Sequence, residues 1–253
     1  MKKGNLRTYS ISILVIATIA LLLSGCASDR GARPSYSYNL PAGTAEKVEQ
    51  SNEIVSDFFS RTGKDIPTGV LSNAAGIAVI PNLTRAAFIV GGSRGTGVLM
   101  TREGERWSLP VFTSITGASL GFQIGITTTD LLLVFQNSDA INRLKDGTYE
   151  LGADVTVAAG PVGGTAGISS KADVLAYKRT EGAFAGAALN GARMSIDPER
   201  TAGYYYGPNA ETARGYYALT DDLLHPGRKA DIQNVPRGAQ QLKQTLERIA
   251  GRK

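Results

Sequence analysis

Residues 117–136 read GASLGFQIGITTTDLLLVFQ, and their first half alternates in the manner of a β-strand. The apolar positions of this alternation, expected on one face of a sheet, are Ala118, Leu120, Phe122, Ile124 and Ile126. The run Leu131–Gln136 is apolar almost throughout, which is typical of a buried strand. No charged residue lies between Arg106 and Asp130. These features predict that the segment forms the centre of a sheet.

The glycines of this segment allow two interpretations. Gly117, Gly121 and Gly125 have the spacing at which transmembrane helices pack together. The two-residue alternation instead favours a strand, in which glycine marks sharp coiling or the close approach of another element. Because the chain holds 30 glycines, we expect a strongly curved sheet.

Further segments on both sides extend this pattern. Short apolar or alternating runs predict additional strands at residues 76–81, 86–93, 97–102, 107–110, 151–159, 173–178 and 183–190. Helices are expected from Thr44, which is a candidate N-cap, near Pro67, over residues 139–145 with Ser138 as N-cap, and at the C-terminus. The apolar stripe of the last helix consists of Ala239, Leu242, Leu246 and Ile249.

The first 26 residues have the pattern of a lipoprotein signal peptide. Lys2, Lys3 and Arg7 precede an apolar stretch over residues 11–23, which is too short to span a bilayer comfortably. The stretch ends in LSGC, which resembles the bacterial lipobox, and Cys26 is the only cysteine of the chain. We therefore expect cleavage before Cys26 and its acylation, with anchoring at the periplasmic face of the outer membrane because Ala27 follows the cysteine.

These patterns predict an α+β fold in which a strongly curved, Gly-rich antiparallel sheet has flanking helices. The predicted organisation is a signal peptide over 1–25, a flexible tether over 26–43, a single domain over 44–207, and a C-terminal extension with a terminal helix over 208–253.

Composition excludes several classes of function. One cysteine and one histidine cannot form a Cys/His zinc site or a disulfide framework, so no metal or cofactor is expected. The net charge of +5 falls to +2 once residues 1–25 are removed, which does not favour a nucleic-acid partner. Two GxSxG strings, centred on Ser93 and Ser119, resemble the nucleophile motif of serine esterases, but strand-like sequence follows both serines. His225 is interpreted as a surface residue of a polar loop.

Several stretches between Ile66 and Gly207 together resemble the SYLF domain family. They are IPTGVLSNAAGIAVIP, GGSRGTGVLMTREGERWSLP, GASLGFQIGITTTDLLLVFQN, LGADVTVAAGPVG, VLAYKRTEGAFAGAALNG and a closing YYG. The resemblance implies an α+β domain that binds phospholipids without catalysis. Eukaryotic members use a preceding basic helix, whereas residues 44–60 here are acidic.

The resulting expectation is a non-enzymatic, membrane-anchored envelope lipoprotein that binds phospholipid or another apolar ligand. The alternatives are a structural or assembly module that binds another envelope protein and, third, a serine esterase. Side chains in the segments that match the family best are the candidate ligand contacts: Arg94, Trp107, Lys178 and Arg179.

Overall fold

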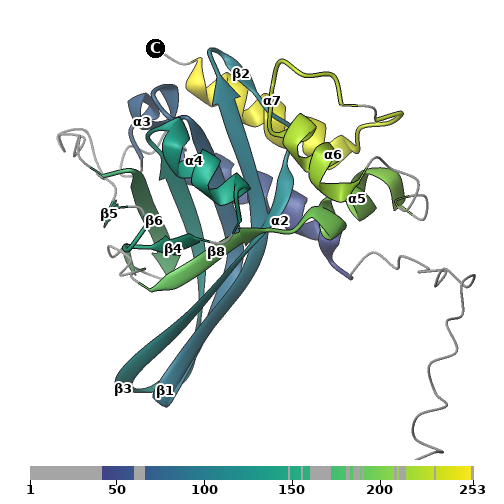
Figure 1. Ribbon diagram of the computed structural model, residues 1–253. Helices are drawn as coiled ribbons and strands as arrows, with labels where there is room; N and C mark the ends of the chain where they lie inside the picture. The colour runs from purple at the N-terminus through teal and green to yellow at the C-terminus, as the bar shows by residue number, and fades with distance from the viewer. Residues whose placement is uncertain are drawn as a thin grey trace, which may run out of the picture. The chain divides into compact units, whose positions relative to one another are not determined.

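The computed structural model describes residues 42–59, 66–147, 149–154, 156–159, 172–180, 183–184, 189, 191–207, 210, 215–230 and 232–251. They form a strongly curled, mainly antiparallel sheet with helices packed against it (Figure 1). The predicted α+β fold class is confirmed. The signal peptide, Cys26 and nearly all of the tether lie outside the described residues.

The described elements follow one another as an N-terminal helical pair, a long strand region and a C-terminal helical region. The helices are α2 (Thr44–Phe58), α3 (Thr68–Ser72), α4 (Ser138–Lys145), α5 (Pro198–Tyr206), α6 (Tyr216–Leu223) and α7 (Arg237–Ala250). The strands are β1 (Gly76–Glu103), β2 (Arg106–Trp107), β3 (Val111–Phe135), β4 (Tyr149–Leu151), β5 (Val157–Ala159), β6 (Val174–Thr180), β7 (Ala183–Phe184) and β8 (Ala192–Ile196).

Several predicted boundaries differ from the structure. The predicted strands at 76–81, 86–93 and 97–102 are one strand, β1, because shifts in its register with β3 bend the strand without ending it. At the first shift, Asn82 adopts a positive φ of 55°, and its N–H donates to Asp130 Oδ1 at 3.0 Å. The N-caps of α2 and α4 are Gly43 and Asn137, one residue earlier than predicted.

The sheet is built around β3, whose two ends have different second partners. Along nearly its whole length β3 pairs antiparallel with β1, from Gly76 opposite Phe135 to Leu99 opposite Val111. Its first part also pairs with β8, and its last part pairs with β6. The outer strand β5 joins β6 in parallel, which is the one departure from the predicted antiparallel arrangement among the described pairs.

A close crossing of β1 over itself curls the sheet. A Cβ placed on Gly97 would lie 1.8 Å from the carbonyl oxygen of Val79, which is far inside van der Waals contact. The two ends of the strand also meet, because the N–H of Arg102 donates to the carbonyl oxygen of Ala75 at 2.7 Å. The predicted strong curvature therefore depends on a position that only glycine can occupy.

Both faces of the central strands are buried. Along β3, Leu132 and Val134 belong to one hydrophobic cluster, whereas Leu131, Leu133 and Phe135 belong to the other. Side chains of α2 and α7 complete the first cluster, and side chains of α4, α5 and α6 complete the second. This alternation follows from the two-residue period of a strand.

The C-terminal helices form part of the same core. The four residues of the predicted apolar stripe, Ala239, Leu242, Leu246 and Ile249, are all buried in α7. The helix α6 buries Leu219 and Leu223. Residues beyond position 207 are thus integrated with the sheet. None of the helices in the described part of the chain has the length and apolar character that crossing a membrane requires.

We predict that Gly97→Ala lowers the free energy of unfolding by about 3 kcal/mol or more, because the added methyl group collides with backbone that side-chain rotation cannot move. The measurement is urea unfolding followed by circular dichroism. Gly69→Ala in α3 is the matched control, since no atom lies within 4 Å of its added Cβ; it should be neutral or stabilise by up to about 1 kcal/mol. Equal stability of both variants would contradict the crossing.

Candidate functional site

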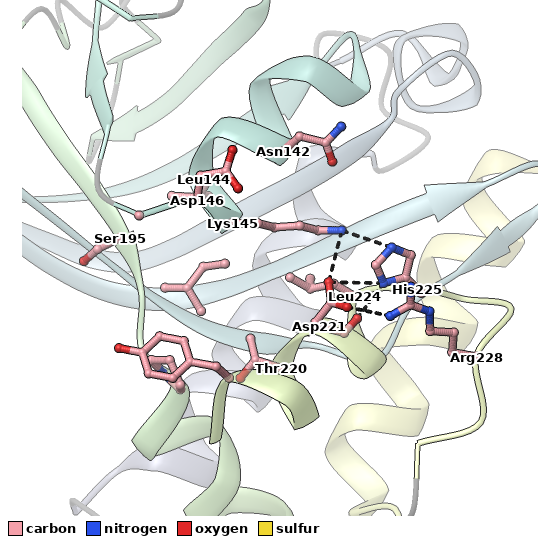
Figure 2. Close-up of a pocket in the computed structure, with 14 residues that line it drawn as sticks. Asn142, Leu144, Lys145, Asp146, Ser195, Thr220, Asp221, Leu224, His225 and Arg228 are labelled. Atoms are coloured by element: carbon pink, nitrogen blue, oxygen red, sulfur yellow. Dashed lines mark hydrogen bonds and ion pairs between the residues drawn. The ribbon is translucent and has the colours of Figure 1, made fainter. Parts of the chain in front are cut away.

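A pocket of about 630 Å³ lies between α4, β8, the start of α5, and α6 with the residues that follow it (Figure 2). We name it the α4–α6 pocket. Its lining residues are Asn142, Leu144, Lys145, Asp146, Gly147, Ser195, Ile196, Pro198, Tyr217, Thr220, Asp221, Leu224, His225 and Arg228.

Local sequence explains how α4 reaches the pocket. The side chain of Asn137 caps the helix by accepting from the N–H of Ala140 at 3.0 Å, and its amide donates to Asp173 at 2.8 Å. Ala140, Ile141 and Leu144 are buried against the sheet. Lys145 follows in the last helical turn, where a cation is favourable, and only 20% of its side chain is exposed.

The opposite wall comes from α6 and the turn after it. Leu219 and Leu223 fix one face of α6 in the core, so that Asp221 is presented to the pocket. The turn then places His225 and Arg228 on the same side, and Arg228 donates to Asp221 Oδ2 at 2.5 Å.

Lys145 and His225 connect the two walls. The Nζ of Lys145 lies 3.4 Å from His225 Nε2 and 3.8 Å from Asp221 Oδ1. His225 Nδ1 lies 2.6 Å from the backbone oxygen of Asp221, which can only accept. In this arrangement Nδ1 carries the proton, and Nε2 accepts from the Lys145 ammonium. The imidazole is therefore neutral while it bridges α4 and α6.

Burial is the main influence on the charge of Lys145. Desolvation lowers the pKa of Lys145 from its ordinary value of 10.5, while the nearby carboxylate of Asp221 acts in the opposite direction. Arg228 lowers it further, and Glu103 and Asp146 raise it. The site thus holds a cation that has lost part of its hydration shell, and such a group interacts strongly with an anion that replaces the lost water.

The remaining lining is mostly apolar, with Asn142, Ser195 and Thr220 as its uncharged polar side chains. Leu144 and Leu224 are each 1% exposed and form the floor, with half-buried Ile196 and Pro198 beside them. Tyr217 is 79% exposed. Figure 2 shows the charged cluster of Lys145, Asp221, His225 and Arg228 on one side of the pocket and Ser195 on the other. The pocket therefore has an ionic end and an apolar end.

The aliphatic hydroxyl groups of the pocket are already engaged. Thr220 donates to the carbonyl oxygen of Tyr216 at 2.7 Å, and Ser195 Oγ lies 3.0 Å from Ser114 Oγ. His225 accepts from Lys145, so it does not activate either hydroxyl. Among the described residues no group of three or more His, Cys, Asp or Glu side chains is arranged to hold a metal. This geometry favours binding over nucleophilic chemistry.

Two of the four predicted ligand contacts lie in the first half of the sheet. Arg94 is exposed on β1, opposite Thr116 of β3. Trp107 is 0% exposed in the hydrophobic cluster that α2 and α7 complete, and the guanidinium of Arg102 lies 6.0 Å from its ring centroid. Trp107 is thus a core residue. Its burial explains why it occurs in a segment that resembles the family, and no role in ligand binding is needed.

The other two, Lys178 and Arg179, are neighbours on β6 and so point to opposite faces of the sheet. Arg179 donates to Asp57 of α2 at 2.9 Å, and its guanidinium lies 5.0 Å from the ring centroid of Phe58. This contact joins α2 to the sheet. Apart from the adjacency of these two residues, no described contact brings any of the four together, and none of them lines the α4–α6 pocket.

The two esterase-like serines lie within strands. Ser93 is opposite Gly117, and Ser119 is opposite Gly91, in the paired region of β1 and β3. Neither serine stands at a turn from a strand into a helix, which the nucleophile motif requires. The segment with the GxxxGxxxG spacing is likewise β3, so the strand interpretation is confirmed.

Sequence reasoning missed the α4–α6 pocket. It placed His225 on the surface, whereas its side chain is 27% exposed and hydrogen-bonded at both nitrogens. The available signal was the single histidine directly after a helix that carries Asp221 and Asp222. Its partner Lys145 is 80 positions away, so the pair is visible only in three dimensions.

A sequence model of the family described as "Ysc84: Las17-binding protein actin regulator" matches residues 116–249. This chain belongs to the Ysc84 family. This family is also called SYLF. The matched segment includes most of β3, every later strand, nearly all of α7 and the charged cluster of the pocket. The match extends past residue 207, at which the sequence predicts the end of the domain.

Curated relatives agree with this assignment. The chain is 31% identical over 207 residues to SH3 domain-containing YSC84-like protein 1 of Xenopus laevis, covering 78% of this chain and 61% of the relative. The human protein of that name is 30% identical over 207 residues, covering 78% and 59%. LAS seventeen-binding protein 3 of Saccharomyces cerevisiae is 31% identical over 183 residues, covering 67% and 39%. This Ysc84 chain thus spans less than two thirds of the length of these relatives.

We predict that, in the pH interval below 10.5, Lys145 makes a contribution to the stability of this Ysc84 chain that increases as the pH rises. Because the folded-state pKa is below the unfolded value of 10.5, the folded chain binds fewer protons in this interval, and stability grows as pH rises toward 10.5. Lys145→Met should reduce the slope of unfolding free energy against pH. Lys229→Met, at an exposed lysine outside the pocket, should retain the slope. Identical slopes in the unaltered chain and in both variants would contradict the buried position of Lys145.

Proposed function

We propose that this Ysc84 chain is a non-catalytic, membrane-anchored lipoprotein of the bacterial cell envelope, and that the α4–α6 pocket binds the headgroup of a phospholipid. The observation that carries the proposal is the division of this pocket into an ionic end and an apolar end (Figure 2). A phospholipid has the same division between its phosphate and its acyl chains.

The ionic end offers donors that suit a phosphate. Lys145 has three N–H donors, two of which are directed at His225 and Asp221. Arg228 has five donors and contacts Asp221 and Asp222 through one nitrogen, with 52% of its side chain exposed. Both side chains therefore keep donors for an incoming anion, and charge-assisted hydrogen bonds of this kind are strong.

The size of the pocket limits how much of the lipid enters. A volume of about 630 Å³ is in the range of pockets for drug-sized ligands. Two long acyl chains in addition to a headgroup exceed that size. We infer that the headgroup and the glycerol enter, that Tyr217 contacts the start of the chains, and that the chains stay in the bilayer. The protein would then recognise a lipid in place without extracting it.

The acidic helix α2 is a poor alternative contact with the membrane. Its exposed residues Glu46, Glu49, Glu53 and Asp57 repel an anionic surface, to which each basic residue would instead contribute about 1 kcal/mol of attraction. Asp57 is held by Arg179 on the sheet. The charge distribution thus favours lipid contact through the pocket and disfavours contact through α2.

The anchor is proposed from the sequence of residues 1–26. Acylation of Cys26 would hold the chain at the periplasmic face of the outer membrane, with residues 27–43 as a tether. Anchoring would raise the effective concentration of headgroups at the pocket, so that a weak intrinsic affinity suffices.

A protein partner is the second candidate. The family description and the name of the yeast relative both refer to binding of Las17, which is a protein. By analogy, this Ysc84 chain could be an assembly module that binds another envelope protein. A chain that binds no lipid but captures one stoichiometric envelope protein would favour this candidate.

We predict that the full-length Cys26→Ser chain binds dihexanoyl phospholipids below their micelle concentration, at one molecule per chain, by isothermal titration calorimetry. Lys145→Gln combined with Arg228→Gln should weaken this binding at least about tenfold, because two charge-assisted contacts are lost. Lys229→Gln combined with Arg237→Gln changes the net charge equally outside the pocket and should have little effect. Absence of binding to every phospholipid tested would refute the proposal.

We also predict that Cys26→Ser moves the protein of intact cells from the detergent phase to the aqueous phase in a detergent-partition experiment, because no acyl chain can then be attached. Ser24→Ala is a control that alters the same motif but keeps the thiol. An unchanged partition of the Cys26→Ser variant would rule out anchoring through this residue.

A further inference from the structure

The charged side chains that line the α4–α6 pocket balance one another. Lys145 and Arg228 are cationic, Asp146 and Asp221 are anionic, and His225 is neutral in the hydrogen-bonded form. The pocket therefore has no excess of positive charge, although two cations line it. A ligand that brought only negative charge would meet both attraction and repulsion there.

The two carboxylates differ in what they contact. The carboxylate of Asp221 accepts a hydrogen bond from Arg228 at 2.5 Å. Its Oδ1 lies 3.8 Å from Lys145 Nζ and 3.5 Å from His225 Nδ1. Asp146 forms no hydrogen bond or ion pair through its carboxylate in the described part of the chain, and no dashed line joins it to the cluster in Figure 2. Asp146 is thus the carboxylate that is available to a ligand.

The position of Asp146 is unfavourable for the helix that carries it. It is the C-cap of α4, where the helix dipole disfavours a negative charge. The preceding Lys145 compensates only partly, because it is directed at His225 and Asp221 across the pocket. A cationic group of the ligand beside Asp146 would remove this unfavourable interaction.

We propose that the ligand of this pocket is a zwitterionic headgroup in which a primary ammonium stands beside the phosphate, as in phosphatidylethanolamine. This inference rests on the proposed phospholipid-binding function. The phosphate accepts from Lys145 and Arg228 at one end, and the ammonium donates to Asp146 at the α4 side of the pocket. Both charges of the headgroup are then paired.

A primary ammonium fits better than a quaternary one. A carboxylate is recognised by N–H donors, which a trimethylated nitrogen lacks, and such nitrogens are bound in cages of aromatic rings. Tyr217 is the only Phe, Tyr or Trp among the lining residues, and it is 79% exposed. The pocket therefore has the carboxylate for an ethanolamine headgroup but lacks the cage for choline.

The test compares three lipids with the full-length Cys26→Ser chain by isothermal titration calorimetry: dihexanoyl phosphatidylethanolamine, phosphatidylcholine and phosphatidylglycerol. We expect the first to bind about two- to fivefold more tightly than either of the others, which is the effect of one exposed charge contact. Asp146→Asn should reduce this preference by the same factor, by improving the binding of phosphatidylglycerol relative to phosphatidylethanolamine. Glu53→Gln removes an equal charge from α2 and should leave the preference unchanged.

The outcomes separate the two proposals. Binding of all three lipids with equal affinity, or tighter binding of phosphatidylglycerol, would overturn the zwitterionic inference and leave phospholipid binding intact. A preference for phosphatidylethanolamine that survives Asp146→Asn would overturn the role of this carboxylate. If none of the lipids binds, the proposed function fails and the inference fails with it.

A separate titration with phosphoethanolamine alone shows whether the headgroup suffices when the lipid binds. If phosphoethanolamine binds as tightly as phosphatidylethanolamine, the contribution of the apolar end is overturned.

Discussion

The crossing of β1 over its own beginning is the contact from which the rest of the fold follows. Gly97 approaches the backbone of Val79 so closely that no side chain fits between them. The sheet consequently curls, and its central strands bury both faces. The helices α2 and α7 cover one face, while α4, α5 and α6 contribute to the cluster on the other (Figure 1). A backbone constraint of a single glycine therefore determines where helices can pack.

The α4–α6 pocket is a consequence of this packing. The apolar faces of α4 and α6 are anchored in the same hydrophobic cluster, so their polar residues meet at the margin. Lys145 and Asp221 are there partly shielded from water, which strengthens their interaction and also the interaction of Lys145 with a ligand. His225 joins both walls, because it contacts Lys145 of α4 through Nε2 and the backbone oxygen of Asp221 in α6 through Nδ1.

The arrangement of polar groups in the pocket supports the proposed non-catalytic function. The hydroxyl groups of Ser195 and Thr220 are occupied, and the imidazole of His225 accepts from a cation. The imidazole therefore activates neither of these two hydroxyl groups. Cations, carboxylates and an apolar floor remain, and these groups recognise a ligand by charge and shape. The longer eukaryotic relatives combine the shared segment with further regions that this chain does not match.

The local pattern of residues in the sequence was sufficient to predict much of the fold. The alternation over residues 117–136, the glycine content and the stripe of α7 predicted a curved sheet with helices, because these signals depend only on neighbours in the sequence. The pattern did not reveal that three predicted strands are one, since a bulge and a true break use the same turn-forming residues. It also missed α5, although Asp197 followed by Pro198 is a recognisable helix start.

The site depended on tertiary structure. The four candidate ligand contacts were selected because they lie in segments that resemble the family: Arg94, Trp107, Lys178 and Arg179. Trp107, however, is in the core, and Arg179 hydrogen-bonds to Asp57 of α2. Lys145 and His225 are 80 positions apart, and nothing local distinguishes either from an ordinary surface residue. The sequence alone was enough to predict a curved sheet with packed helices and the apolar stripe of α7, because these signals come from neighbouring residues. Only the folded sheet decided which charges share a pocket, because that depends on how distant elements pack and not on the order of residues.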